Sequence, residues 1–131
     1  LQQDKPEDFV IATGRQESVR RFIEICAAEL GWFNKKIQKS IIWEGEGLLE
    51  VGKRADTLEE VVKVDSNYFR PTEVETLLGD SQKARDKLNW HPNISLEEMI
   101  KEMIAFDTKE SKKEALLKER GFADTKYNRE D

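Results

Sequence analysis

Apolar residues between positions 18 and 31 recur every three or four residues, which is the spacing of one face of an α-helix. Ser18 stands directly before this stripe and can accept a backbone hydrogen bond as an N-cap, while Gly31 can end the helix. The pattern predicts an amphipathic helix over residues 18–30. Its apolar face comprises Val19, Phe22, Ile23, Cys26, Ala27 and Leu30.

A second apolar stripe follows a capping signal. Ser95 and Glu98 have the spacing of a capping box, in which each side chain bonds the backbone N–H of the other residue. The pattern predicts a long helix that begins after Ser95. Residues 107–114 are almost entirely polar, so we expect the helix to break or to project beyond Phe106. The stripe before that point comprises Leu96, Met99, Ile100, Met103, Ile104 and Phe106.

A short helix is predicted ahead of this long one. Asp80 can cap a helix that carries Ala84 and Leu88 on its apolar side. The helix should stop near Asn89, because the residue before Pro92 is driven out of the helical conformation.

Residues 71–78 carry the signals of a further helix. Proline favours the first helical position, where Pro71 stands, and Gly79 occupies the place of a left-handed C-terminal cap. Arg70 would then lie just before a helix N-terminus, where free N–H groups and the helix dipole already favour an anion. A phosphate group is the obvious candidate.

Three short apolar runs predict β-strands. Residues 9–14 form a run of the length of a buried core strand, and residues 41–43 and 61–65 are rich in β-branched side chains. The charged residues 50–60 predict an exposed loop. Together these patterns indicate an α/β fold with about three short strands and four to five helices.

The composition excludes several classes of function. The 131 residues include 27 acidic and 22 basic side chains, a net charge of −5, which argues against a nucleic-acid-binding surface. No apolar run approaches the roughly 18 residues that cross a bilayer, and the N-terminus lacks the features of a signal peptide. Cys26 is the single cysteine, so no intrachain disulfide is expected. These features predict a cytoplasmic protein in a reducing compartment.

The two ends of the chain are also informative. Leu1 is not an initiator methionine, and the first four residues look like the end of a longer helix, which suggests a fragment of a larger protein. A trimmed or processed N-terminus is the alternative. Residues 1–122 are predicted to form a single domain, and residues 123–131 a charged, flexible tail.

Several segments together resemble the GDP-mannose 4,6-dehydratase family, and the resemblance covers about residues 1–122. The most specific one is the run Tyr68-Phe69-Arg70-Pro71-Thr72-Glu73-Val74-Glu75-Thr76-Leu77-Leu78-Gly79-Asp80. The others are Asp8-Phe9-Val10-Ile11-Ala12-Thr13-Gly14, Ser18-Val19-Arg20, Trp43-Glu44-Gly45, Val64-Asp65, Lys83-Ala84 and Leu88-Asn89-Trp90 followed by Pro92.

The resemblance implies a fold, a cofactor and a reaction. The family belongs to the extended short-chain dehydrogenase/reductases, in which an N-terminal Rossmann domain holds NADP and a helix-rich C-terminal portion binds the nucleotide-sugar. This chain resembles that C-terminal portion and lacks the full Rossmann domain. The implied lyase reaction oxidises GDP-mannose at carbon 4, eliminates water across carbons 5 and 6, and returns the hydride to carbon 6. Its product, GDP-4-dehydro-6-deoxymannose, is a precursor of GDP-fucose.

The groups that carry such chemistry are missing from the sequence. The reaction needs a tyrosine with a lysine four residues later, but Tyr68 is followed there by Thr72 and Tyr127 by Asp131. The dinucleotide-binding glycines are missing as well, since Glu50 occupies the third glycine position after Gly45-Glu46-Gly47. We therefore expect no catalytic residue and no cofactor site on this chain; NADP belongs to the implied parent enzyme.

The resemblance does assign substrate contacts. It implies that Arg70 binds the diphosphate of GDP-mannose and that Glu73 binds the ribose hydroxyls, and a guanidinium and a carboxylate suit these groups. The alternatives are an ordinary surface arginine and a first-turn glutamate favoured by the helix dipole. Arg15 follows the predicted strand 9–14 and is a weaker candidate, since an exposed loop arginine is the simpler interpretation. His91 has no second histidine or cysteine cluster beside it, so no metal site is expected.

Two kinds of partner are implied. One is the missing Rossmann half, which would cover this portion in the parent enzyme. The other is a second copy, because a surface cut from a domain interface exposes apolar area and can self-associate or exchange a helix. A non-catalytic interaction module is thus the competing hypothesis, and membranes and nucleic acids are not expected partners.

Overall fold

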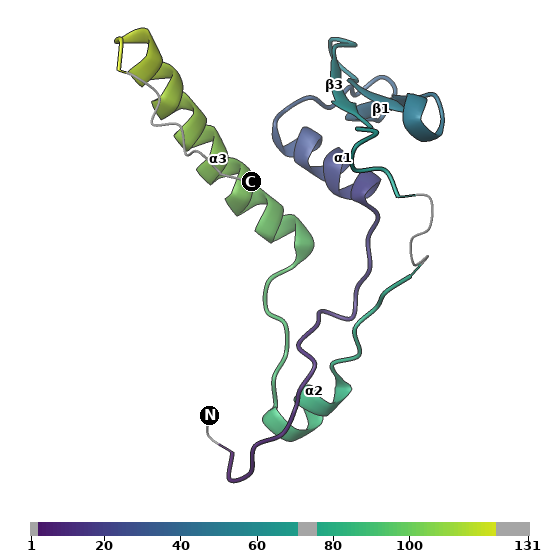
Figure 1. The fold of residues 1–131 in the computed structure, drawn as a ribbon, viewed down its shortest axis with the longest axis vertical. Coiled ribbons are helices and arrows are strands. Elements are labelled where there is room, and N and C mark those ends of the chain that lie inside the picture. Colours follow the sequence, from purple (N-terminus) through teal and green to yellow (C-terminus); the bar gives the residue numbers. More distant parts are fainter. Residues whose placement is uncertain (1–2, 71–75, 123–131) are drawn as a thin grey trace.

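The computed structural model describes residues 3–70 and 76–122, which form two parts connected by extended segments (Figure 1). One part contains helix α1, a three-stranded sheet and the long helix α3. The other contains helix α2 beside the N-terminal segment. The two parts show that the described chain does not enclose one large core.

Helix α1 spans Val19–Glu29, as the apolar stripe predicts. Its N-cap is Ser18, whose hydroxyl accepts a hydrogen bond from the backbone N–H of Arg21 at 3.1 Å. Gly31 follows the helix with φ of +84°, a conformation that glycine adopts without steric cost. The predicted start and end of this helix are both confirmed.

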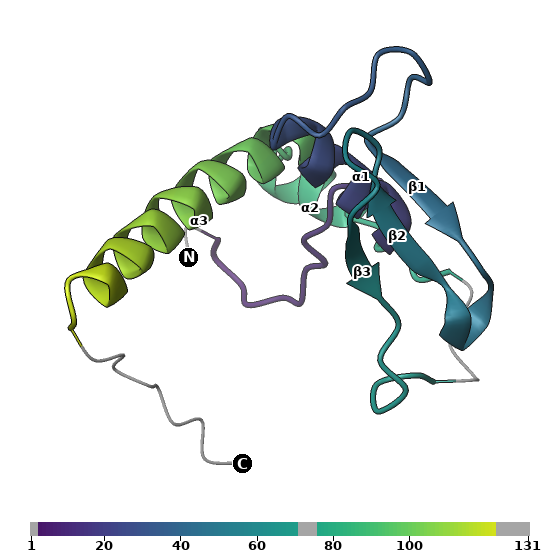
Figure 2. The same cartoon turned by 90° about the horizontal axis from the view of Figure 1, so that it is seen from above.

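The sheet consists of β1 (Ile41–Glu44), β2 (Val51–Arg54) and β3 (Glu60–Lys63), antiparallel in the order β1-β2-β3 (Figure 2). A one-turn 3-10 helix, Gly47–Leu49, connects β1 to β2. Trp43 lies opposite Gly52, where an added Cβ would come within 2.8 Å of the indole ring. Glycine at this position therefore lets the indole lie flat across the middle strand.

One loop prediction and one strand prediction are wrong. Residues 50–60 do not form an exposed loop, because β2 within them is the central strand and is paired on both sides. Residues 9–14 are not a buried core strand: they have no strand partner in the described chain, and Val10 and Ile11 are more than half exposed. A strand depends on its neighbours, and pattern alone does not show whether a neighbour is present.

The core is small and lies where α1 meets the sheet and α3. Its buried apolar residues include Ala27, Ile41, Ala55 and Ile100. Ile100 is the large side chain that is completely buried, and it comes from the second turn of α3. Packing of α3 against α1 therefore depends on a short stretch at the start of the long helix.

Helix α2 spans Gln82–Leu88 and confirms the short helix predicted after Asp80. The Asp80 carboxylate accepts a hydrogen bond from the Gln82 backbone N–H at 2.9 Å. The helix ends at Asn89, which takes a left-handed conformation with φ of +50°. Lys87 pairs with Glu7 at 3.0 Å, so the helix also holds the N-terminal segment.

The helix predicted over residues 71–78 is not found in the part of that segment that the structure describes. Residues 71–75 lie outside the described residues, and residues 76–78 are not helical. Gly79 is not a left-handed cap, since its φ is not among the positive ones. Its role is steric instead, because an added Cβ at Gly79 would lie 2.7 Å from the Cβ of Ala12.

Helix α3 spans Leu96–Glu119 and begins with the predicted capping box. The Glu98 N–H donates to the Ser95 hydroxyl at 3.2 Å, and the Ser95 N–H donates to the Glu98 carboxylate at 2.8 Å. The helix does not break after Phe106, because residues 107–114 are mostly good helix formers without glycine or proline. It projects as an arm beyond the rest of the fold (Figures 1 and 2).

Replacing Ser95 with alanine should lower the free energy of unfolding by about 1 kcal/mol, the usual value of an N-cap. Urea denaturation followed by circular dichroism measures the change. Ser111→Ala, at an exposed interior position of the same helix, is the matched control and should leave stability unchanged or slightly raised. Equal effects of the two substitutions would show that the capping box does not stabilise α3.

Candidate functional site

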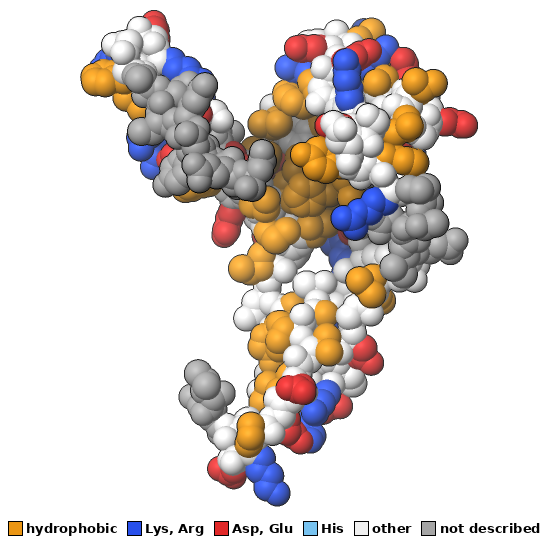
Figure 3. Space-filling view, viewed as in Figure 1, with side chains coloured by type: hydrophobic (Ala, Val, Ile, Leu, Met, Phe, Trp, Pro, Cys, Tyr) orange, Lys and Arg blue, Asp and Glu red, His pale blue; other side chains and the backbone are white. Residues whose placement is uncertain are grey.

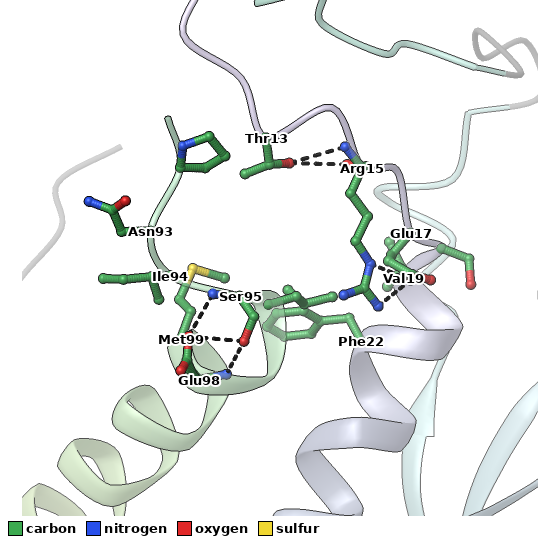
Figure 4. A pocket seen from close by; sticks show the side chains of 13 residues that line it. Thr13, Arg15, Glu17, Val19, Phe22, Asn93, Ile94, Ser95, Glu98 and Met99 are labelled. Atoms are coloured by element: carbon green, nitrogen blue, oxygen red, sulfur yellow. Dashed lines mark hydrogen bonds and ion pairs between the residues drawn. The ribbon is translucent and has the colours of Figure 1, made fainter. Parts of the chain in front are cut away.

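A cleft of about 900 Å³ lies between the chain that leads into α1 and the chain that leads into α3 (Figure 4). Thr13, Arg15 and Glu17 line one wall, and residues 92–96, 98 and 99 line the other. The walls are about eighty positions apart in sequence, so the fold alone brings them together.

The interior of the cleft is mainly apolar. Val19 and Phe22 contribute from α1, while Ile94 and Met99 contribute from the opposite wall. Val19 is 75% exposed and Ile94 is 59% exposed, which is unusual for side chains of this kind. Figure 3 shows hydrophobic side chains gathered in the hollow between the projecting α3 and the part that carries α1.

Arg15 stands at the edge of the cleft and binds two carboxylates. Its Nη1 and Nη2 each donate to one oxygen of Glu97 at 3.0 Å, a two-pronged contact. Its Nε and Nη2 donate to Glu17 Oε1 at 2.9 and 2.6 Å. The backbone N–H of Arg15 also donates to the Thr13 hydroxyl at 3.3 Å. Four side-chain hydrogen bonds thus fix the guanidinium.

These contacts change the acidity of the groups involved. The hydrogen bonds from Arg15 lower the pKa of Glu97, and those to Glu97 and Glu17 raise the pKa of Arg15. The pKa of Glu98 is lowered too, but by hydrogen bonds from the backbone and hydroxyl of Ser95. All three groups are therefore charged at neutral pH.

The charges around the cleft do not favour an anion. Arg15 is the basic side chain of the lining, and Glu17 and Glu98 are acidic. An anion that approached Arg15 would compete with carboxylates already bound to it. The cleft is better suited to an apolar group or to an apolar covering segment.

The other predicted contacts lie elsewhere. Arg70 is exposed and ends the first described stretch, just after a turn in which the Tyr68 N–H donates to the Asp65 carbonyl at 3.1 Å. Of the described residues, those that line the cleft include Arg15 but not Arg70. Glu73 lies outside the described residues. The substrate contacts assigned to Arg70 and Glu73 thus remain predictions.

The described side chains form no cluster of metal ligands. Within residues 3–70 and 76–122, no three His, Cys, Asp or Glu side chains come together to hold an ion. His91 is exposed and lies 3.3 Å from the Asn89 side-chain oxygen. Cys26 is partly buried, and this burial raises the pKa of its thiol.

Sequence reasoning missed one wall of the cleft. The sequence of Pro92 to Ile94 shows neither periodicity nor a ligand motif, so it predicts no part of a site. An isoleucine between the polar Asn93 and Ser95 is the one signal that the sequence offers.

No helix in the described parts of the chain is long and apolar enough to cross a lipid bilayer.

By its fold and cleft, the chain is an α/β protein with a concave apolar surface framed by two helix starts. It belongs to the GDP-mannose 4,6 dehydratase family, whose model matches residues 1–103. The family resemblance of the sequence is thereby confirmed.

Individual relatives agree with this assignment. GDP-mannose 4,6 dehydratase 2 of Caenorhabditis elegans is 53% identical over 107 residues, which cover 82% of this chain and 26% of the relative. GDP-mannose 4,6-dehydratase of Yersinia enterocolitica is 46% identical over 132 aligned positions, covering 93% of this chain and 34% of the relative. The GDP-mannose 4,6 dehydratase of Homo sapiens is 47% identical over 107 residues, which cover 82% of this chain and 27% of the relative. The chain spans about a quarter to a third of the length of these relatives.

The pKa of Glu97 should rise toward the usual 4.5 when Arg15 is replaced by glutamine, because the lowering hydrogen bonds are lost. Carboxyl-carbon NMR titration of both proteins measures this. Glu98 is the internal control, since Ser95 and not Arg15 lowers its pKa.

The lowered pKa also gives a direction for stability. A carboxylate with a lowered pKa in the folded state stabilises the fold above its unfolded pKa. The contribution of the Arg15–Glu97 pair to the free energy of unfolding should be complete above pH 4.5. It should disappear as the pH falls through the lowered pKa of Glu97. An unchanged Glu97 titration in Arg15→Gln would contradict the contact.

Proposed function

We propose that this chain is the nucleotide-sugar-binding part of a GDP-mannose 4,6-dehydratase. The observation that carries the proposal is the family match over residues 1–103, supported by relatives that bear this name at 41–53% identity. The parent activity is conversion of GDP-mannose to GDP-4-dehydro-6-deoxymannose with NADP, a step toward GDP-fucose.

In this proposal the chain binds substrate and does not perform the chemistry. Neither Tyr68 nor Tyr127 has a lysine four residues later, and the glycine-rich dinucleotide motif is missing from the sequence. The hydride acceptor and the proton-transferring residues therefore belong to a Rossmann part that packs against this chain. Turnover of GDP-mannose by the purified chain with NADP would contradict the proposal.

Arg70 is the proposed contact for the diphosphate, and Glu73 for the ribose. A guanidinium can donate two charge-assisted hydrogen bonds to phosphate oxygens, and a carboxylate can accept two from a vicinal diol. The exposed position of Arg70 at the end of a turn is compatible with such a contact. Arg15 is a weaker candidate, because a phosphate would have to displace Glu97 and Glu17 from it.

Arg70→Ala should weaken binding of GDP-mannose by about 2 to 3 kcal/mol, or roughly 30- to 150-fold, because a bidentate charged contact is lost. Titration of the ligand to millimolar concentration, followed by NMR, measures the affinity. Glu73→Ala should weaken the binding of GDP-mannose less, since the ribose hydroxyls that Glu73 is proposed to bind are neutral.

Two controls make this measurement specific. Arg120→Gln, next to the far end of α3, removes one exposed arginine without touching the proposed site. Guanosine lacks the diphosphate and should bind the Arg70→Ala and unsubstituted chains equally. Equal GDP-mannose affinities of these two chains would contradict the role of Arg70, and binding to neither would contradict the proposal that this chain binds the nucleotide-sugar.

A self-associating interaction module is the second candidate, and the exposed apolar surface favours it. Val19 is 75%, Phe106 is 65% and Leu49 is 82% exposed, and each would be covered by a partner chain or a Rossmann part. Burial of such area stabilises association roughly in proportion to its extent.

This candidate predicts a concentration-dependent increase in mass. Sedimentation equilibrium at micromolar concentrations should show dimers or larger species, and Phe106→Ser should shift the equilibrium toward monomer because a large apolar side chain is removed. Leu30→Ser, at the end of α1 and away from the projecting helix, serves as a comparison. A monomer at every concentration would exclude this candidate.

A further inference from the structure

The contact between Arg15 and Glu97 connects the starts of two helices. Arg15 lies three residues before Ser18, the N-cap of α1, and Glu97 lies in the first turn of α3. The two residues are 82 positions apart in sequence. Glu97 therefore moves with α3, while Arg15 is linked to α1 through the two residues that precede the Ser18 cap.

The same contact connects one wall of the cleft to the helix turn that carries part of the other wall. Arg15 belongs to the wall before α1, and Glu97 sits between Leu96 and Glu98 of the other wall. Figure 4 shows the Arg15 side chain extending from the Thr13 side of the cleft toward Phe22 and the beginning of α3. A change in this contact would alter the distance between the walls.

Other interactions between α1 and α3 do not fix an angle as well. Ile100 is completely buried, but the hydrophobic attraction that holds it there has no preferred direction. A planar guanidinium bound by two oxygens of one carboxylate fixes both distance and orientation. Glu17 holds the other edge of the guanidinium through Nε and Nη2, which restricts its rotamer.

We propose that Arg15 is a positioning residue that sets the angle between α1 and α3 and thereby the width of the cleft. The projecting part of α3 acts as a lever, since the helix continues to Glu119, far beyond the buried Ile100. The contact is partly open to solvent, with side-chain exposures of 45% for Arg15 and 48% for Glu97. Salt or a competing anion can therefore reach it and release the helix.

This proposal does not depend on the family's reaction or on the ligand. It requires only that the ion pair constrains the helix angle more than the apolar contact does. If the apolar contact alone fixes the angle, Arg15 is an ordinary surface charge whose loss changes nothing beyond its own position.

The experiment measures a distance between α1 and α3 in the full chain. Spin labels are attached at Glu29→Cys and Lys113→Cys in a Cys26→Ala background, and pulsed EPR gives the distribution of distances. Both label positions are exposed, and Lys113 lies on the projecting part of α3. Circular dichroism of each variant reports whether the helices are intact.

The expected result is a broader distribution for Arg15→Gln and for Glu97→Gln. The double variant should be no broader than either single one, because the two substitutions remove the same contact. Arg15→Lys retains the charge but loses the two-pronged geometry, so it should be intermediate. Raising NaCl from 0.1 to 1 M, which shortens the Debye length from about 10 to about 3 Å, should broaden the distribution of the unsubstituted protein alone.

The matched control is Arg54→Gln. Arg54 forms a similar two-pronged pair with Asp56 at 3.0 and 2.8 Å, but within one hairpin. Its loss should leave the α1–α3 distribution unchanged. A distribution in Arg15→Gln that matches the unsubstituted protein, additive broadening in the double variant, or equal broadening in Arg54→Gln would overturn the proposal.

Discussion

The described part of this chain depends on the packing of α1 against the first turns of α3. Ile100 is completely buried there, and Ala27 of α1 is almost so. This contact holds the long helix, positions the sheet that packs on α1 and places two distant loops opposite each other. Since so few side chains are fully buried, each of them carries a larger share of the stability than it would in a bigger core.

Helices were predictable from sequence where local signals determine them. Ser18 and Gly31 bound α1, and the capping box of Ser95 with Glu98 begins α3 as predicted. Strands were less predictable because their partners are distant: β2 is charged enough to resemble a loop, yet it is central in the sheet. Residues 9–14 show the converse, since an apolar run without a neighbouring strand stays extended and exposed.

For the candidate site, too, the sequence offers signals that lie within a few residues but not those that depend on distant segments. Arg70 and Glu73 were proposed from a motif within a few residues, and the described residues do not extend through that motif. The cleft could not have been proposed from sequence, because its walls come from segments joined only by the fold. Arg15 was identified as a candidate ligand contact, but the two glutamates that bind it are visible only in three dimensions.

The close approach of Gly79 to Ala12 has a consequence for substitutions in this chain. A Cβ at position 79 would lie 2.7 Å from the Cβ of Ala12, so a side chain at position 79 requires the segment around Ala12 to shift. Backbone movement is limited as well, because Lys83 of α2 donates to the Asp8 carbonyl at 2.9 Å and holds the two segments together. An engineer who replaces Gly79 therefore has to reckon with the segment around Ala12, although that segment lies more than sixty positions earlier in the sequence.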